Sequence, residues 1–201
     1  MAPSGWDNLM NELLKQGFTA EQLLEAGVVS KSQKSGKYFD RMRERVIIPI
    51  TDLHGRVVAF GGRILDDSTQ KDAPKYLNSP ESAIFKKGNL LFGLDKSNRA
   101  IFDKKFAIVV EGYMDAISLY QRGFNNVVAS LGTALTEEQG RLLRKYSEQV
   151  ILSYDSDGAG QEAIMRGLSI LENQGCDARV LQMEGAKDPD EYVIKYGSGR
   201  F

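Results

Sequence analysis

Short apolar runs alternate with helical segments from about residue 100 onward, and this alternation restricts the possible folds more than any other feature of the chain. The runs are apolar at consecutive positions, which is typical of strands covered on both faces. Helices between consecutive strands allow those strands to run parallel. We therefore expect an α/β fold with a parallel sheet. The expected strands are FAIVV (106–110), NVVASL (126–131), VILSY (150–154) and ARVLQM (178–183).

The start and stop signals of helices support this pattern. Gly123 and Gly175 follow helical segments at positions suited to C-terminal capping. Thr136 is followed three residues later by a glutamine, which is the spacing of a capping box. Asp188 precedes Pro189, a favourable first residue of a helix. These signals predict a helix after each of the four strands.

The first half of the chain contains a different set of elements. Apolar residues at helical spacing predict helices within residues 1–30. The runs 46–50 and 56–62 predict a β-hairpin, and Pro49 favours an edge position for its first strand. Residues 66–90 are rich in Asp, Ser, Asn, Pro and Gly, so we expect an ordered loop there.

We expect two domains, at residues 1–97 and 98–201, and their charges differ. Between Lys31 and Arg63 there are eight Lys or Arg against three Asp or Glu. From Asp155 onward there are nine Asp or Glu against five Lys or Arg. A basic polyanion-binding domain followed by an acidic metal-binding domain would have this distribution. Two ordinary solvated surfaces remain an alternative.

Composition restricts the kind of metal that the chain can bind. A single cysteine, Cys176, and a single histidine, His54, exclude a thiolate zinc cluster and a His-rich site. Any metal must therefore bind to carboxylates, which suits Mg²⁺ or Mn²⁺. No apolar stretch reaches the roughly 18 residues that a membrane span needs. We expect a cytoplasmic, monomeric protein.

Acidic residues follow three of the four predicted strands. Parallel strands end at the same edge of a sheet, about 4.8 Å apart, so carboxylates there can share a cation. Without a cation their mutual repulsion would raise their pKa values and cost stability. These acids are Glu111 and Asp115 after the first strand, Asp155 and Asp157 after the third, and Asp188 and Asp190 after the fourth.

Each acid also has a purely structural interpretation. Asp188 can act only as a helix N-cap. Glu111 can act only as a negative charge at the start of a helix. Asp115 can simply face solvent, and the segment from Asp155 to Asp157 can be an ordinary loop. The sequence leaves these alternatives open.

Several longer stretches resemble one family. VVEGYMDAISLYQRGF and VILSYDSDGAG resemble the two halves of the Toprim signature, a glutamate and an Asp-x-Asp pair that each follow a strand. YFDRMRERVIIPITDLHGRVVAFGGRIL, PKYLNSPESAIFKKGNLLFGL, VASLGTALTEEQ and KDPDEY resemble the RNA polymerase core of bacterial DNA primases. The likeness begins at APSGWD and reaches the last helix. It implies a Toprim (Rossmann-like) parallel-sheet domain preceded by a small mixed α+β subdomain.

The resemblance implies roles for individual positions. Glu111, Asp155 and Asp157 match metal-binding carboxylates, and Asp115 matches a supporting member of the catalytic set. Asp188 and Asp190 match acids that complete the metal site. The positions that match residues of the nucleic-acid and NTP groove are Arg43, Arg45, Arg63, Lys75, Asn78 and Lys87.

The resemblance also implies an activity and its partners. Primases of this family synthesise short RNA primers from NTPs on a single-stranded DNA template, using Mg²⁺ or Mn²⁺. The family carries zinc in an N-terminal domain and binds the replicative helicase through a C-terminal domain. This chain has no zinc site, and we expect both of those parts to be missing. We therefore expect a piece of the catalytic core that makes little primer alone.

Two other classes of function remain. A phosphatase of the haloacid-dehalogenase type would use Asp155 as the nucleophile that attacks phosphorus. That mechanism leaves Glu111 without a role. The chain could also be a non-catalytic fragment that binds only single-stranded DNA or a metal.

Overall fold

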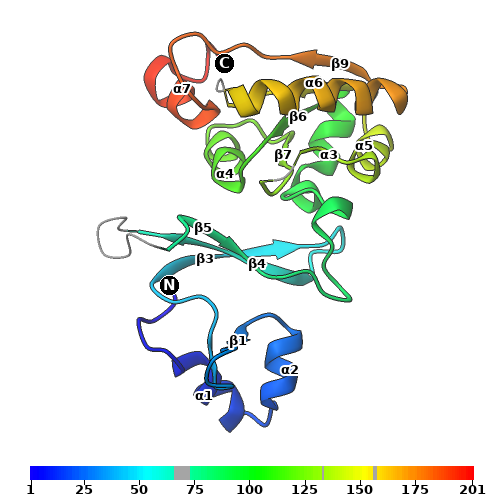
Figure 1. Cartoon of the computed structure of the whole chain (residues 1–201). Helices are drawn as coiled ribbons and strands as arrows, with labels where there is room; N and C mark the ends of the chain where they lie inside the picture. Colours follow the sequence, from blue (N-terminus) through cyan, green and yellow to red (C-terminus); the bar gives the residue numbers. More distant parts are fainter. Residues whose placement is uncertain (66–72, 133, 156–157) are drawn as a thin grey trace. The chain divides into compact units, whose positions relative to one another are not determined.

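The computed structural model divides into two compact units, each described here by itself (Figure 1). The described residues are 1–65, 73–132, 134–155 and 158–201. Unit 1 comprises Met1–Thr51 and Arg56–Lys86, and unit 2 comprises Asp52–Gly55 and Lys87–Phe201. Ser97, where we predicted a domain boundary, is buried in a helix of unit 2. The division of the chain into a nucleic-acid-binding domain at 1–97 and a metal-binding domain at 98–201 stays a prediction. In the described part of the chain, no helix is both long and apolar enough to cross a membrane.

Unit 1 begins with the two short helices that the sequence predicted. Its first elements are α1 (Asn8–Lys15), α2 (Ala20–Glu25), β1 (Val29–Lys31) and β2 (Tyr38–Asp40). Thr19 and Gln22 form a capping box at the start of α2. β1 and β2 pair antiparallel, and the sequence did not predict this pair because strands of three residues have no readable period.

The predicted hairpin is present and belongs to a three-stranded antiparallel sheet. β3 (Arg45–Thr51) pairs with β4 (Val57–Ile64), and β3 lies at the edge, as Pro49 indicated. The expectation that residues 66–90 form only a loop is wrong. β5 (Tyr76–Asn78) pairs with β4, and a 3₁₀ helix, η1, follows at Lys87–Asn89. The short strand exists because of this long-range pairing, since its own sequence carries no strand signal.

Unit 2 contains the predicted parallel sheet. Its strands run in the order β7-β6-β8-β9, and all three pairings are parallel. Crossover helices connect consecutive strands, as parallel pairing requires. The strands are β6 (Phe106–Val110), β7 (Val127–Ala129), β8 (Gln149–Leu152) and β9 (Asp177–Val180).

Helices cover both faces of this sheet (Figure 1). Successive residues of β6 point to opposite faces, so Ala107 and Val109 enter one core cluster and Ile108 and Val110 enter the other. The first cluster includes residues of α3 (Leu94–Lys104), α5 (Glu137–Arg144) and α6 (Gly158–Asn173). The second includes residues of α4 (Tyr113–Gln121) and α7 (Pro189–Tyr196). Only α3 was absent from the sequence prediction.

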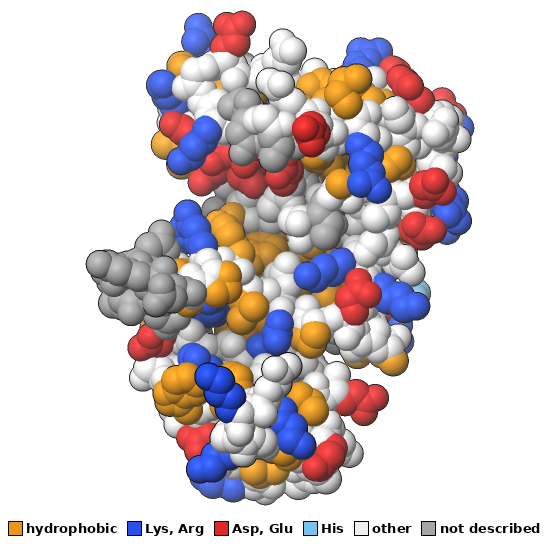
Figure 2. Space-filling model, viewed as in Figure 1, with side chains coloured by type: hydrophobic (Ala, Val, Ile, Leu, Met, Phe, Trp, Pro, Cys, Tyr) orange, Lys and Arg blue, Asp and Glu red, His pale blue; other side chains and the backbone are white. Residues whose placement is uncertain are grey.

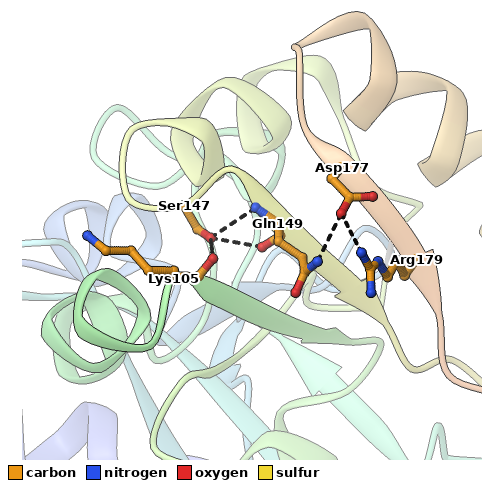
Figure 3. A network of polar contacts seen from close by, with 5 residues as sticks. All are labelled: Lys105, Ser147, Gln149, Asp177 and Arg179. Carbon is orange, nitrogen blue, oxygen red and sulfur yellow. Dashed lines mark hydrogen bonds and ion pairs between the residues drawn. The ribbon is translucent and has the colours of Figure 1, made fainter.

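A polar network ties the amino ends of three strands together (Figure 3). The Ser147 hydroxyl donates to the Lys105 carbonyl (2.7 Å) and accepts from the Gln149 amide (3.2 Å). The Gln149 side chain and Arg179 both donate to the Asp177 carboxylate at 2.9 Å. These two bonds, that from Gln149 first, lower the pKa of Asp177. The network lies at the sheet edge opposite to the carboxyl ends of the strands.

Candidate functional site

Glu111 and Asp155 leave the same edge of the parallel sheet. β8 pairs with β6 so that Leu152 lies opposite Val109. Glu111 is the second residue after Val109 and Asp155 the third after Leu152, so both follow the carboxyl ends of adjacent strands, roughly 5 Å apart. The third predicted ligand, Asp157, lies outside the described residues.

Asp115, in the first turn of α4, indicates how closely the acids approach one another. Its pKa is raised from 3.8 to about 7. Burial is the largest cause, followed by the negative charges of Asp155 and Asp188 and, more weakly, of Asp190. A backbone hydrogen bond at Gly112 acts in the opposite direction. Carboxylates from two other segments, the one after β8 and the start of α7, therefore act on the Asp115 side chain.

Asp115 also has a local structural role. Gly112 is the N-cap of α4 and Asp115 is the third helical residue, so its carboxylate can satisfy an amide at the helix start. A Cβ atom at Gly112 would lie 2.9 Å from Asp115 Oδ2 and would displace it. Asp115 is half-buried, so the alternative that it simply faces solvent is wrong.

Asp188 and Asp190 hold the last helix in place. Asp188 is the N-cap of α7, where its Oδ1 accepts a 2.7 Å hydrogen bond from the Glu191 amide, which confirms the predicted cap. Asp190 Oδ1 accepts a hydrogen bond from the buried Ser118 hydroxyl of α4. Arg122 Nη1 lies 4.0 Å from the same oxygen. Capping does not exclude a second role, because Asp188 also raises the pKa of Asp115.

The surroundings of Glu111 include residues that the sequence did not single out. The Glu111 carbonyl accepts a 3.1 Å hydrogen bond from the Gly132 amide, in the loop after β7. The preceding Leu131 has a φ of 65°, in the left-handed region that a branched side chain rarely adopts. Burial raises the pKa of Tyr154, the Ser130 hydroxyl lowers it, and the Glu111 charge raises it. The loop belongs to the stretch VASLGTALTEEQ that carries the family resemblance, and its only local signal is the glycine.

The donors at this edge suit a hard divalent cation, since all are carboxylates. Acidic side chains gather on one face of unit 2 (Figure 2). Burial of Asp115 and, after it, repulsion from the neighbouring acids raise the pKa of Asp115, and a bound cation would relieve this repulsion. Within the described ranges, no three Asp, Glu, His or Cys side chains are arranged closely enough to hold a metal ion. Asp157, next to Asp155 in the predicted ligand set, is not among those residues.

The first two predicted basic residues have different environments. The Arg45 side chain is buried and lies across β4 at Gly62, where an added Cβ would come within 2.9 Å of Arg45 Cδ. Its guanidinium donates to the carbonyls of Gly62 (3.3 Å), Lys75 (3.1 Å) and Pro74 (2.7 Å). These bonds favour a structural role for Arg45. Arg43 is half-exposed and stacks on an aromatic ring.

Of the other predicted polar residues, Arg63 and Lys75 lie beside the exposed Tyr76, Asn78 is on the same strand as Tyr76, and Lys87 belongs to unit 2. Arg63 Nε donates to the Tyr76 hydroxyl at 3.3 Å, and the Lys75 ammonium lies 5.9 Å from the Tyr76 ring centroid. Asn78 follows on the same strand and is half-buried. All three were predicted from the sequence, whereas Tyr76, whose exposed ring lies near both cations, was not. Lys87 lies in η1 of unit 2 and is half-buried.

A parallel sheet with a glutamate after β6 and an aspartate after the adjacent β8 defines a Toprim-type domain. Residues 108–193 match the family described as "Toprim-like". Residues 1–98 match "DNA primase catalytic core, N-terminal domain". The chain belongs to the DnaG-type bacterial DNA primases and covers these two parts of the catalytic core.

Individual relatives agree with this assignment. A DNA primase of Clostridium acetobutylicum is 48% identical over 200 residues, which are 100% of this chain and 32% of that protein. The crystal structure of a DNA primase domain from Pseudomonas aeruginosa matches with a TM-score of 0.88 and 41% identity, covering 100% of this chain and 62% of that one. A DnaG primase catalytic domain bound to ssDNA matches with a TM-score of 0.87 and 40% identity, with the same coverage. The chain thus spans about a third of the curated relatives. These comparisons give no support to a phosphatase.

Proposed function

We propose that this chain carries the metal-dependent nucleotidyl-transfer site of a DNA primase. The reaction joins the 3′-hydroxyl of a ribonucleotide to the α-phosphate of an incoming NTP and releases pyrophosphate. The observation that supports it most directly is the raised pKa of Asp115, to which burial contributes most and to which the charges of Asp155, Asp188 and Asp190 also contribute. A cluster of this kind gains stability from a divalent cation and loses it without one.

In this proposal the acidic side chains bind the cations, and neighbouring residues keep those side chains in position. Glu111, Asp155 and Asp157 would be direct ligands, and Asp115, Asp188 and Asp190 would complete the site through water, because Mg²⁺ usually keeps several waters. When bound, Mg²⁺ or Mn²⁺ would lower the pKa of the attacking hydroxyl and stabilise charge on the phosphates.

Asp115 links cation binding to protonation. Its carboxyl, with a pKa of about 7, is largely protonated at slightly acid pH when no cation is present. A nearby positive charge favours the ionised form, so cation binding would release this proton. Ser118 and Arg122 keep the neighbouring Asp190 oriented between α4 and α7. No side chain of the chain is proposed as a covalent nucleophile.

Polyanion binding would fall to the predicted basic residues and Asn78. Arg43, Arg63, Lys75, Asn78 and Lys87 would contact template phosphates and the NTP triphosphate. Arg45 would act mainly by holding the backbone that presents Lys75, since its guanidinium bonds to the Lys75 and Pro74 carbonyls. Binding that depends on such contacts falls steeply with salt, because counterions are released from the nucleic acid.

The proposed partners follow from the family. A solved relative is described as a DnaG primase catalytic domain bound to ssDNA, and single-stranded DNA is the template proposed for this chain. NTPs would be the substrates, and the helicase would bind elsewhere in the full primase. We propose a monomer that works in the cytoplasm. Because solved primase domains extend beyond this region, we expect the 201 residues alone to synthesise little primer.

Calorimetric titration with Mn²⁺ tests the metal assignment. Glu111→Gln and Asp155→Asn are expected to weaken Mn²⁺ binding at least about tenfold, since each removes a charged oxygen ligand. Asp103→Asn is the matched control, because Asp103 is an exposed carboxylate paired with Arg99 on α3. If neither site variant changes Mn²⁺ affinity relative to this control, the metal assignment is wrong.

A template-directed synthesis assay separates the catalytic proposal from a fragment that only binds. Adding the remaining core segments of a relative should raise primer synthesis by the parent chain, and not by Glu111→Gln. Equal synthesis by the two chains would show that the reaction does not use this site.

A further inference from the structure

Gln139, near the start of α5, is a fully buried polar side chain that bonds to a distant segment of unit 2. Its amide nitrogen donates to the carbonyl of Lys87 at 3.1 Å and to that of Leu90 at 2.8 Å, at the start of η1 and just after it. Its amide oxygen accepts a 3.0 Å hydrogen bond from the Thr136 amide. The side chain therefore uses both of its donors and its acceptor, and only one orientation of the amide allows this.

Thr136 holds the same short helix at a second point. Its hydroxyl accepts from the Gln139 main-chain amide (3.1 Å), which completes the capping box of α5, and donates to the Gly88 carbonyl. A Cβ atom at Gly88 would lie 3.3 Å from Thr136 Cγ2, so the two segments are in close contact. Three successive main-chain carbonyls in and beside η1 are thus bonded to two side chains of α5 and its cap, since the carbonyl of Asn89 alone is left out of the run from Lys87 to Leu90.

α5 is itself held firmly in unit 2. Gly140 faces α6, where an added Cβ atom would come within 3.2 Å of Ile170 Cγ2. Leu143, on the next turn, is fully buried in the first core cluster. Because close-packed interiors leave little room for rearrangement, the bonds from Gln139 and Thr136 fix η1 relative to the parallel sheet.

The residue of η1 that carries a charge is Lys87, one of the predicted basic residues, and its side chain is half-buried. A lysine side chain has a flexible four-carbon stem, so the place of its ammonium depends on how firmly its backbone is held. Burying the Gln139 amide is unfavourable unless its hydrogen bonds are made, and the Thr136 hydroxyl alone would cap α5. The two bonds from Gln139 to η1 therefore contribute order to the segment that presents Lys87.

We propose that Gln139 is a positioning residue for nucleotide binding, which holds η1 so that Lys87 meets the triphosphate of an NTP. A lysine whose backbone is fixed before binding loses less freedom when the nucleotide arrives, and this raises affinity. Lys87 makes the phosphate contact, and Gln139 touches neither the nucleotide nor a cation. The proposal rests on the proposed function, to which it adds Gln139 and Thr136 as residues that act through Lys87.

A double-mutant cycle separates positioning from a general effect on the fold. Calorimetry with Mn²⁺ present measures the ATP affinity of the full chain, of Gln139→Leu, of Lys87→Gln and of the double variant. Lys87→Gln should weaken ATP binding about tenfold or more, through loss of one charge-assisted hydrogen bond. Gln139→Leu should weaken it about 2- to 12-fold, the range for ordering one side chain on binding. In the Lys87→Gln background, Gln139→Leu should have no further effect, because its effect passes through Lys87.

Asn126→Leu is the matched control. Asn126 is also a fully buried amide, and its side chain donates to the Phe106 carbonyl (3.1 Å) at the amino end of β6. This variant should lose stability as Gln139→Leu does and leave the ATP affinity unchanged. Trypsin cleavage after Lys87 should be faster in Gln139→Leu than in Asn126→Leu, because only the first variant releases η1.

Thr136 keeps the test available if Gln139→Leu does not fold. Thr136→Ser retains the hydroxyl and should bind ATP as the parent does. Thr136→Val loses the bond to the Gly88 carbonyl and should weaken ATP binding, again with no further loss in the Lys87→Gln background.

The outcomes distinguish this proposal from the function on which it rests. If Lys87→Gln weakens ATP binding and neither Gln139→Leu nor Thr136→Val does, positioning is wrong while the proposed function stands. Additive losses in the double variant would also overturn the proposal, since Gln139 would then act independently of Lys87. If Lys87→Gln leaves ATP binding unchanged, or the parent binds no ATP, the nucleotide contact in the proposed function fails together with this proposal.

Discussion

Replacing Asp115 by asparagine tests the convergence of the acids, because it removes the charge that the others repel. The Asp115 pKa is about 7 in the folded protein, against 3.8 for an unperturbed aspartate; burial is the largest cause of this rise, and the charges of Asp155, Asp188 and Asp190 add to it. That difference is about 3 units at 1.36 kcal/mol each, so ionised Asp115 costs the fold up to about 4 kcal/mol. The protonated form contributes its full stability below about pH 4, and this contribution is lost as the pH rises through 7.

Asparagine is uncharged at every pH, so Asp115→Asn should remove this pH dependence. In buffers with EDTA we expect the variant and the parent to have similar free energies of unfolding near pH 4.5. At pH 8 the variant should be more stable by a few kcal/mol, less any loss from the weakened bond to Gly112. Urea unfolding at several pH values measures the difference, and saturating Mn²⁺ should reduce it at pH 8 by stabilising the parent.

The matched control is Asp103→Asn, which makes the same chemical change at an exposed carboxylate paired with Arg99 (3.0 Å). Loss of that surface pair should change the free energy of unfolding by less than about 1 kcal/mol across the same pH range. A difference between Asp115→Asn and the parent that does not grow from pH 4.5 to 8 would refute the reasoning. The acids would then lie too far apart, or too well solvated, to share a cation.

Asp188→Ala should lower the free energy of unfolding by about 0.5–2 kcal/mol, because it removes the N-cap of α7. Asp188→Asn keeps the cap and should lose only Mn²⁺ affinity. Equal unfolding curves for the two variants would contradict the capping role. Gln139→Leu should lower the free energy of unfolding, measured with urea, by at least about 2 kcal/mol, because the Lys87 and Leu90 carbonyls lose the hydrogen bonds from the Gln139 side chain. An unchanged free energy would mean that water replaces both bonds. Mn²⁺ binding near pH 6.5 should release protons, which calorimetry detects as a binding enthalpy that depends on the buffer. Asp115→Asn should reduce this dependence. The same dependence in the parent and the variant would show that the protons come from groups other than Asp115.

The sequence predicted those features that depend on neighbouring residues in the chain. Consecutive apolar positions in FAIVV and VILSY indicated strands covered on both faces, and the sheet is parallel with helices on each face. Capping at Thr136 and Asp188 was readable because a cap bonds only three residues ahead. That Glu111 and Asp155 follow the carboxyl ends of adjacent strands was also predictable, since parallel strands end at one edge whatever the details of packing.

Features that depend on contacts between distant segments were not readable. The three-residue strands β1, β2 and β5 form through pairing with partners elsewhere in the chain. Arg45 looked like the surface arginines beside it, but it is buried because carbonyls of residues 62, 74 and 75 surround its guanidinium.

The chain by itself determined the parallel sheet and the order in which acids leave it, because both follow from local periodicity and strand direction. Only the tertiary structure decided the protonation of Asp115 and the bonds from Gln139 to η1. A pKa depends on burial and on the distance to other charges, and the partners of a buried amide depend on which segment packs against it. Neither is a property of the residue or of its neighbours in sequence.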